Sequence, residues 1–187
     1  MISIDIVQSE EDILGIVALL QINLRRNLSL DKQSSNGFVS IEYEPKFLQK
    51  INQLAPSIIA KDSTSKVVGY SLVILPQIAV ELPELNKIIL LINKLEYKNI
   101  PLQNYTYYIM GQVCIASDYR GQKIFDRMLH KHRELYADRY QLLITDISDK
   151  NIPSFRAHAR VGFETIYSYN DPISNETWHI VLWDWRK

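Results

Sequence analysis

The chain has few residues that cross-link or bind metals. Cys114 is its only cysteine, which excludes an intramolecular disulfide and any zinc site built from several thiolates. The four histidines, His130, His132, His158 and His179, show no metal-ligand spacing. His130 and His132 lie two apart on a predicted helix, so they point to different faces. We therefore expect no metal.

The sequence also has no excess charge of either sign. Lys and Arg number 21, as do Asp and Glu, so no global basic field predicts a nucleic-acid partner, and any anion site must be local. Apolar runs are far shorter than the roughly 20 residues that span a bilayer. The opening "MISIDIVQSEEDI" has neither a basic nor an apolar leader region. We expect a cytoplasmic protein without a membrane partner.

The composition is that of one soluble globular domain, which we assign to residues 1–187. Hydrophobic residues make up 47% and charged residues 22%, so a sizeable core can form. Residues 77–103 differ from the rest of the chain in their hydrophobic pattern and are interpreted as a helical insert. The helix that Pro83 opens is apolar on nearly every face. Such a helix is usually buried in the core or forms a lid, and a homodimer contact is the alternative.

Hydrophobic periodicity predicts the order β-α-α-β-β-(helical insert)-β-α-β-α-β-β. The clearest hairpin is "SIIAKDSTSKVVGYSLVIL", and Gly111 in the long strand "YTYYIMGQVCIA" indicates a bulge or a close backbone approach. Strands 104–116 and 141–147, joined through a helix over 121–138, would make a right-handed parallel crossover. The pattern predicts an α+β domain with a mixed sheet.

The stretch "DYRGQKIFDRML" places Arg120 and Lys123 at the start of this helix, where the helix dipole is already positive. A bound anion would explain both charges, because the free N–H groups of a first helical turn bind phosphate. Gly121 supplies the backbone freedom that such a turn needs. The alternative is a solvated basic cluster that costs up to about 1 kcal/mol. The turn by itself supports both interpretations equally.

Two segments, "VCIASDYRGQKIFDRML" and "NIPSFRAHARVGFE", resemble the cofactor-binding core of the GNAT superfamily of N-acetyltransferases. The resemblance implies a mixed, mostly antiparallel sheet with splayed central strands and flanking helices. It also implies acetyl-CoA as co-substrate and direct transfer of the acetyl group to an amine in a ternary complex. Two positions depart from the family pattern: Lys123 stands where Gly is usual, and Phe125 where Gly or Ala is usual. The alternative is a catalytically weak acyl-CoA-binding or protein-interaction domain on the same fold.

The resemblance also assigns the cofactor-binding residues. Strand residues would line the pantetheine arm, one of their N–H groups would polarise the thioester carbonyl, and the turn would hold the pyrophosphate. The residues are Val113, Cys114, Ile115, Arg120, Gly121, Gln122, Lys123, Ile124, Phe125 and Asn151. Cys114 could instead be a nucleophile, although a small apolar strand residue is the commoner role for a free cysteine. Asn151 would bond the pantetheine amide, or cap the helix that follows it.

Two residues are candidates for catalysis. His158 falls where many family members carry a tyrosine that protonates the departing thiolate, and its alternative is a structural histidine. Asp146, at the end of strand 141–147, is the best-placed general base, with Glu96, Tyr107 and Tyr108 as further candidates.

The acceptor is less well specified. In related folds the loop 25–44 and the insert 77–103 flank the acceptor side. Their mixed charges favour neither a polyanion nor a polycation. We expect a small molecule or an amino-acid-like amine.

Overall fold

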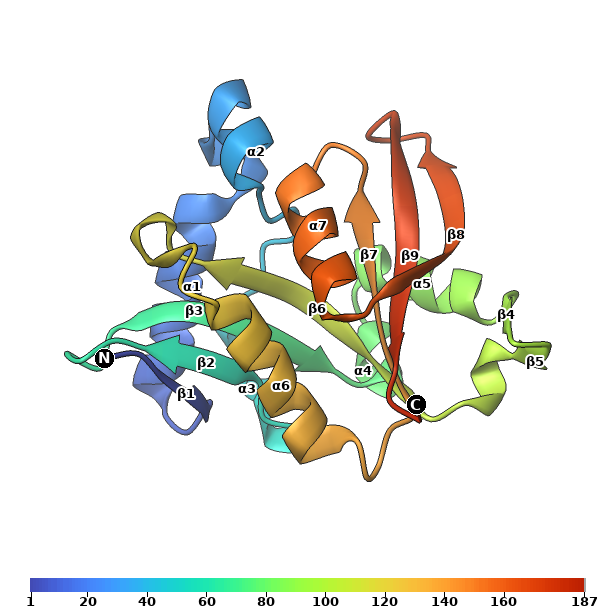
Figure 1. The fold of residues 1–187 in the computed structure, drawn as a ribbon, viewed down its shortest axis with the longest axis horizontal. Coiled ribbons are helices and arrows are strands. Elements are labelled where there is room, and N and C mark those ends of the chain that lie inside the picture. The colour runs from blue at the N-terminus through green and yellow to red at the C-terminus, as the bar shows by residue number, and fades with distance from the viewer. Residues whose placement is uncertain (187) are drawn as a thin grey trace.

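The computed structural model describes residues 1–186 and contains one seven-stranded sheet (Figure 1). Across the sheet the strands are β1 (Ser3–Ile6), β2 (Ile58–Lys61), β3 (Val67–Ile74), β6 (Tyr107–Ile115), β7 (Leu142–Ser148), β9 (Glu176–Asp184) and β8 (Glu164–Asp171). Among the described strands of this sheet, only β6 and β7 pair in parallel, and α6 connects them. The predicted α+β class and the parallel crossover are confirmed.

Helices cover both faces of the sheet. They are α1 (Glu10–Asn23), α2 (Leu30–Asn36), α3 (Pro45–Leu54), α4 (Pro76–Ala79), α5 (Pro83–Ile92), α6 (Ile124–Tyr136) and α7 (Ile152–Val161). A small hairpin of β4 (Glu96–Tyr97) and β5 (Ile100–Pro101) follows α5. Helices α6 and α7 lie in front of the sheet in Figure 1, and α1, α3 and α5 lie behind it. None of the helices within residues 1–186 is long and apolar enough to span a bilayer.

Local signals in the sequence place the ends of several helices. Ser9 caps α1 by accepting a hydrogen bond from the N–H of Asp12 at 3.3 Å. Pro45 and Pro83 begin α3 and α5, where a missing N–H costs nothing. Gly162 ends α7 with φ of +112°, a left-handed conformation that glycine adopts readily.

Each face of the sheet packs against its own core. Alternation along β7 sends Ile144 toward α1, α3 and α5, and Leu143 toward α6 and α7. The insert belongs to the first core, because Ile88 and Ile92 of α5 are buried there. Leu90 of the same helix is 55% exposed, so α5 has one outward face. The expectation that the insert forms part of the core is met.

The parallel pair β6–β7 separates soon after it begins. Its register runs from Tyr107 opposite Leu142 to Ile109 opposite Ile144, and no pairing continues beyond that point among the described residues. The remaining lengths of both strands diverge, as Figure 1 shows, and α7 lies across the opening. The splayed central strands that the resemblance implied are present.

Gly111 marks a bulge just past the point of separation. The register between β3 and β6 shifts at this position, so β6 contains an extra residue. A Cβ on Gly111 would lie 2.2 Å from Cδ1 of Ile74, so glycine is the residue that fits. The phenol of Tyr43 donates to the Gly111 carbonyl at 3.1 Å. Both the bulge and the close approach that the sequence indicated occur.

Candidate active site

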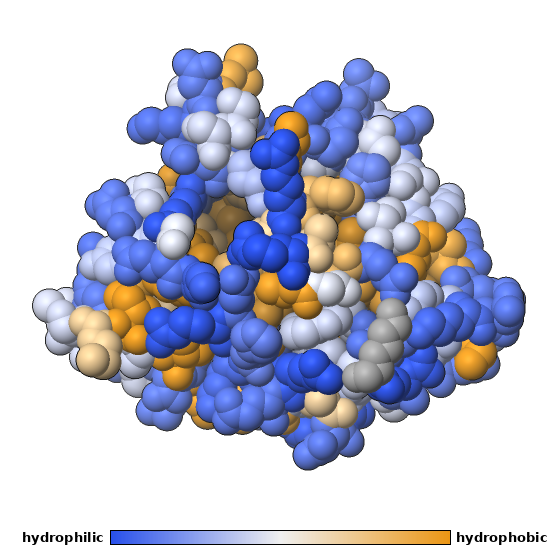
Figure 2. All heavy atoms as spheres, in the orientation of Figure 1, coloured by the Kyte–Doolittle hydropathy of each residue, from blue (hydrophilic) through white to orange (hydrophobic). Residues whose placement is uncertain are grey.

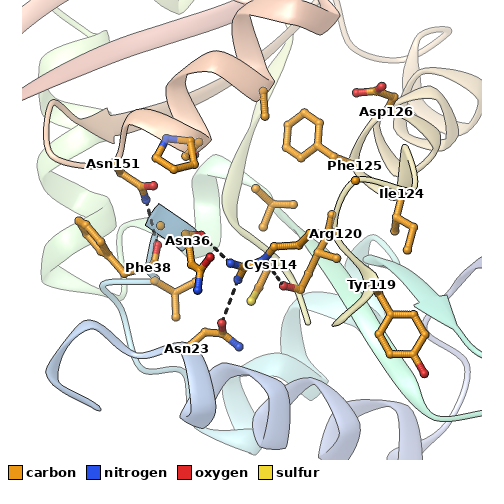
Figure 3. Close-up of a pocket in the computed structure, with 18 of the residues that line it drawn as sticks. Asn23, Asn36, Phe38, Cys114, Tyr119, Arg120, Ile124, Phe125, Asp126 and Asn151 are labelled. Atoms are coloured by element: carbon orange, nitrogen blue, oxygen red, sulfur yellow. Dashed lines mark hydrogen bonds between the residues drawn. The ribbon is translucent and has the colours of Figure 1, made fainter. Parts of the chain in front are cut away.

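A cavity of about 500 Å³ extends from the first turn of α6 to the end of β6 and the start of α7. The segment that leaves α2, including Gly37 and Phe38, forms its roof, and the start of α7 forms one wall. Figure 2 shows a hollow with an apolar floor on this face, below α2. Figure 3 shows the side chains around it. The cavity therefore brings the turn before α6 and the start of α7 to one place.

The turn before α6 has the geometry of an anion site. Gly121 has φ of +76° and open space around it, and Lys123 begins the helix with φ of +57°. The first turn of α6 leaves its N–H groups without acceptors inside the helix, and these donors adjoin the cavity. The left-handed conformation at Lys123 costs roughly 1 kcal/mol, because Lys has a Cβ and Gly does not. Lys123 is exposed and lines the cavity, and within residues 1–186 it forms no ion pair.

Arg120 is engaged with the protein rather than directed into the cavity alone. Its guanidinium donates to the carbonyl of Ile115 at 3.0 Å, to the carbonyl of Asn36 at 2.8 Å and to Oδ1 of Asn23 at 3.2 Å. Figure 3 shows these three bonds converging on one side chain. Arg120 thereby ties the ends of α1 and α2 to the end of β6, and it supports the roof of the cavity.

The predicted pantetheine wall lies along the cavity. Val113, Cys114 and Ile115 all line it. Burial raises the pKa of the Cys114 thiol to about 12, so the thiol is neutral and a poor nucleophile at physiological pH. These facts favour the small apolar role over the nucleophilic one.

The turn residues differ in where their side chains lie. Ile124 and Phe125 are buried in the core beneath α6 and α7, although both reach the cavity. Phe125 thus occupies core space rather than the phosphate approach. Gln122 is exposed, does not line the cavity, and donates to the Asp118 carbonyl at 3.5 Å.

Asn151 lines the cavity, and one half of its amide is unpaired. Its Nδ2 donates to the Phe38 carbonyl at 3.0 Å, whereas its Oδ1 is buried and has no hydrogen-bond partner among residues 1–186. The side chain makes no capping bond to α7, so the alternative role as a helix cap is not seen. A buried acceptor without a donor is costly, and a ligand N–H would satisfy it. This orphaned oxygen fits the amide of a pantetheine arm.

A narrower cavity of about 80 Å³ continues between the splayed strands. It shares Phe38, Val113 and Asn151 with the larger cavity. Its other walls include Asp146 and His158, the two residues that the sequence suggested for catalysis. The tertiary structure therefore brings both candidates to the gap where strand pairing stops.

His158 is buried as a neutral ring. It lies edge-on to Phe125 and Phe163, with ring centroids 5.0 and 4.9 Å away, and burial lowers its pKa to about 4. Its Nδ1 lies 2.7 Å from the carbonyl oxygen of Ser154, which only accepts, so Nδ1 carries the proton. Nε2 is then an acceptor, and it has no partner. The acid role for His158 stays a prediction, and it would require the proton to move to Nε2.

Asp146 is a partly buried carboxylate at the separated end of β7. Oδ2 accepts a hydrogen bond from the phenol of Tyr169 at 2.7 Å. Burial raises its pKa from 3.8 to about 6, and the Tyr169 bond and the Lys87 ammonium oppose that shift. A carboxylate with such a pKa can take up a proton near neutral pH.

The other candidate bases lie elsewhere. Glu96 is in the hairpin after α5, and Tyr107 packs in the core without lining either cavity. Tyr108 is fully buried and its hydroxyl lies 2.8 Å from Nδ1 of His132. None of the three reaches the gap.

Sequence reasoning missed several residues of the site. Tyr169 on β8, Trp178 on β9 and the roof residue Phe38 all contribute, and Gln112 holds the roof by donating to the Ile41 carbonyl at 2.9 Å. Alternation in "FETIYSYN" predicted a strand but not which phenol would reach Asp146. No local signal marks the others. Metal ligands were not predicted, and no cluster of three or more potential ligands occurs within residues 1–186.

Comparisons by sequence and by structure differ in outcome. No protein-family model matches the chain, and no curated protein sequence matches it. A chain of the NatC complex bound to Gag peptide and CoA has a TM-score of 0.66 and 12% identity, with 98% of each chain covered. An N-acetyltransferase from Staphylococcus aureus Mu50 gives 0.63 and 14%, with 99% of each chain covered. A GNAT-family acetyltransferase from Streptococcus pneumoniae gives 0.61 and 15%, covering 97% of this chain and 98% of its own.

This chain has the GNAT fold. The resemblance that the motifs around residues 107–165 indicated thus extends over nearly all of the chain. The mixed sheet, the splayed strands and the turn before α6 are the GNAT features described above. Sequence identities between 12% and 15% support a common fold only, so the activity must be inferred from the site.

Proposed function

We propose that the protein is an N-acetyltransferase that transfers the acetyl group of acetyl-CoA to an amine. The observation that carries the proposal is the cavity at the turn before α6, which shares Phe38, Val113 and Asn151 with the narrower cavity between β6 and β7. Asn151 Oδ1 is buried and unpartnered within residues 1–186. Anion donors lie at one end of the cavity and a titratable carboxylate lies beyond the other. An extended ligand with phosphates at one end and a reactive acyl group at the other fits this order.

The geometry supports an assignment of the residues that would hold acetyl-CoA. The free N–H groups after Gly121 and the ammonium of Lys123 would bind the pyrophosphate. Asn151 Oδ1 would accept from a pantetheine amide, while Val113 and Ile115 would flank the arm. Arg120 would act mainly by holding the roof in place, because its donors already have three protein acceptors.

The chemistry would take place in the narrow cavity. Asp146 would accept a proton from the amine, directly or through a water, so that the amine nitrogen can attack the thioester. A backbone N–H among residues 113–115 would stabilise the negative charge that develops on the carbonyl oxygen. His158 would hydrogen-bond to the reacting groups through Nε2. Acetyl transfer would then be direct, in a ternary complex, because Cys114 is a neutral, buried thiol.

Calorimetric titration tests binding first. Acetyl-CoA should bind with micromolar affinity, and affinity should fall from acetyl-CoA to dephospho-CoA to pantetheine as phosphates are removed. Release of free CoA thiol in the presence of amines then tests turnover. No binding of acetyl-CoA would overturn the proposal, whereas binding without amine-dependent thiol release would leave an acyl-CoA-binding domain on this fold.

A further inference from the structure

A lysine from the insert pairs with a carboxylate near the narrow cavity. Lys87 of α5 forms an ion pair with Asp171 at the end of β8, and its Nζ lies 5.1 Å from the centroid of the Tyr169 ring. The phenol of Tyr169 donates to Asp146, and the Lys87 charge acts on Asp146 as well. We name Asp146, Tyr169 and Asp171 the β8 acidic site. In the free protein it holds an alkylammonium group, that of Lys87.

The components of this site differ in how firmly they are held. The side chain of Asp171 is 12% exposed, and the N–H of Ser174 donates to its Oδ2 at 2.9 Å. The side chain of Lys87 is 41% exposed and ends in a flexible four-carbon stem. An incoming cation can therefore displace the lysine, while the carboxylate and the ring stay in place. The site contains two carboxylates, Asp146 and Asp171, and one lysine, so it is negatively charged when both carboxylates are ionised.

A second, independent observation points to the same kind of ligand. His158 is 2% exposed and lines the narrow cavity with Asp146, and its Nε2 has no partner. Since Nδ1 carries the proton, Nε2 offers a lone pair. The lining of the cavity thus includes two acceptor groups, the carboxylate of Asp146 and the imidazole of His158. A group rich in N–H donors satisfies both.

We propose that the acceptor is an aliphatic diamine, with its reacting nitrogen between Asp146 and His158 and its second ammonium in the place of Lys87, against Asp171 and over the Tyr169 ring. This inference rests on the proposed function. The reacting ammonium gives one proton to Asp146. The neutral nitrogen then forms a bond to the acetyl carbon as the bond from that carbon to sulfur breaks. The second proton leaves nitrogen for the thiolate, so the products are the amide and CoA thiol, and Asp146 returns its proton to water.

Three four-carbon amines separate the possible acceptors: putrescine, butylamine and γ-aminobutyrate, which end in a cation, a methyl group and an anion. With saturating acetyl-CoA, kcat/KM for putrescine should exceed that for butylamine by tenfold or more, and γ-aminobutyrate should be the poorest. Calorimetry of the ligand-free protein should show binding of putrescine and none of γ-aminobutyrate. Equal rates for all three would overturn the inference, and so would a preference for γ-aminobutyrate, which would make Lys87 a carboxylate ligand.

Two variants test where the second ammonium of the diamine binds. Lys87→Met keeps the length of the stem and removes the charge, so KM for putrescine should fall several-fold and KM for acetyl-CoA should stay the same. Asp171→Asn should raise KM for putrescine by tenfold or more and leave butylamine unchanged, which also shows that the variant is folded. A rise in KM for putrescine in Lys87→Met would overturn the assignment.

The experiment also distinguishes this inference from the proposed function. Failure of acetyl-CoA to bind removes the proposed function. If acetyl-CoA binds and the rate of thiol release does not depend on the second charge of the amine, the proposed function still holds. Only the proposal of a diamine acceptor is then overturned.

Discussion

One half of the Asn151 amide is paired and the other is not: Nδ2 donates to the Phe38 carbonyl at 3.0 Å, while Oδ1 is buried without a partner within residues 1–186. The bond from Nδ2 fixes the orientation of the amide, and Oδ1 can accept a hydrogen bond from a ligand. Asn151→Ala should therefore weaken acetyl-CoA binding by about tenfold, the usual value of one buried hydrogen bond. Titration calorimetry measures it. Asn36→Ala is the control, because Asn36 also borders the cavity but its side chain is exposed. Equal affinity of Asn151→Ala and the wild type would remove Asn151 from the site.

Substitutions of Lys123 and of Arg120 should have different effects on ligand binding and on stability. Lys123→Gln removes an exposed charge at the turn, so acetyl-CoA should bind roughly threefold to tenfold more weakly, and added salt should reduce the difference. Acetyl-pantetheine, which carries no pyrophosphate, should bind both proteins alike. If Lys123→Gln weakened acetyl-pantetheine equally, the lysine would not act on phosphate.

Arg120→Gln removes a guanidinium with three protein acceptors. The free energy of unfolding should fall by roughly 1–3 kcal/mol, as expected for hydrogen bonds of a charged donor. Urea denaturation measures this change. Because the roof of the cavity loosens, acetyl-CoA and acetyl-pantetheine should lose affinity by the same factor. An effect confined to acetyl-CoA would show instead that Arg120 contacts phosphate.

Asp146 should link activity to pH. As a base it must be ionised, so the rate of amine acetylation should rise with pH through about 6, the value to which burial raises its pKa. Asp146→Asn should lower kcat by about a hundredfold or more. His158→Phe should keep the pH dependence, since the pKa of His158 is lowered to about 4. If the rise of the rate with pH disappeared in His158→Phe, the histidine would be the general base.

The same pKa shift has a consequence for stability. The folded state binds the proton of Asp146 more tightly than the unfolded state, so ionisation lowers stability as pH rises from about 4 to about 6. Asp146→Asn does not ionise, and above pH 6 it should be more stable than the wild type by roughly 1–2 kcal/mol, given that the group is partly solvated. Urea unfolding at pH 4 and pH 8 should show the gain only at the higher pH. A gain of the same size at both would contradict it.

The bulge in β6 depends on Gly111. Gly111→Ala should lower the free energy of unfolding by roughly 1–3 kcal/mol, because its Cβ would lie 2.2 Å from Cδ1 of Ile74. The double variant Gly111→Ala with Ile74→Val lacks that Cδ1 atom and should recover part of the loss. Thermal or urea unfolding of the two single variants and the double variant completes the cycle. No recovery would mean that backbone conformation, and not the clash, requires glycine.

The amino-acid sequence by itself determined the order of the main elements and the position of the turn before α6. These rest on local interactions: Ser9 caps α1 by bonding to the N–H three residues ahead, Pro83 begins α5, and Gly121 adopts the left-handed conformation of the turn. Alternating and helical periodicities placed the strands and α6 within a few residues. The bulge at Gly111 was likewise visible, because a glycine in a strand signals close backbone approach.

Only the tertiary structure decided what these elements do together. Arg120 was predicted to meet phosphate from its neighbours in the chain, yet its acceptors Asn36 and Asn23 lie 84 and 97 residues away. Asn151 finds Phe38 across 113 residues, and Lys87 finds Asp171 across 84. Which residues become partners over such separations depends on which strands pair and which faces pack. Because pairing and packing depend on the whole core, a short stretch of sequence does not predict these contacts.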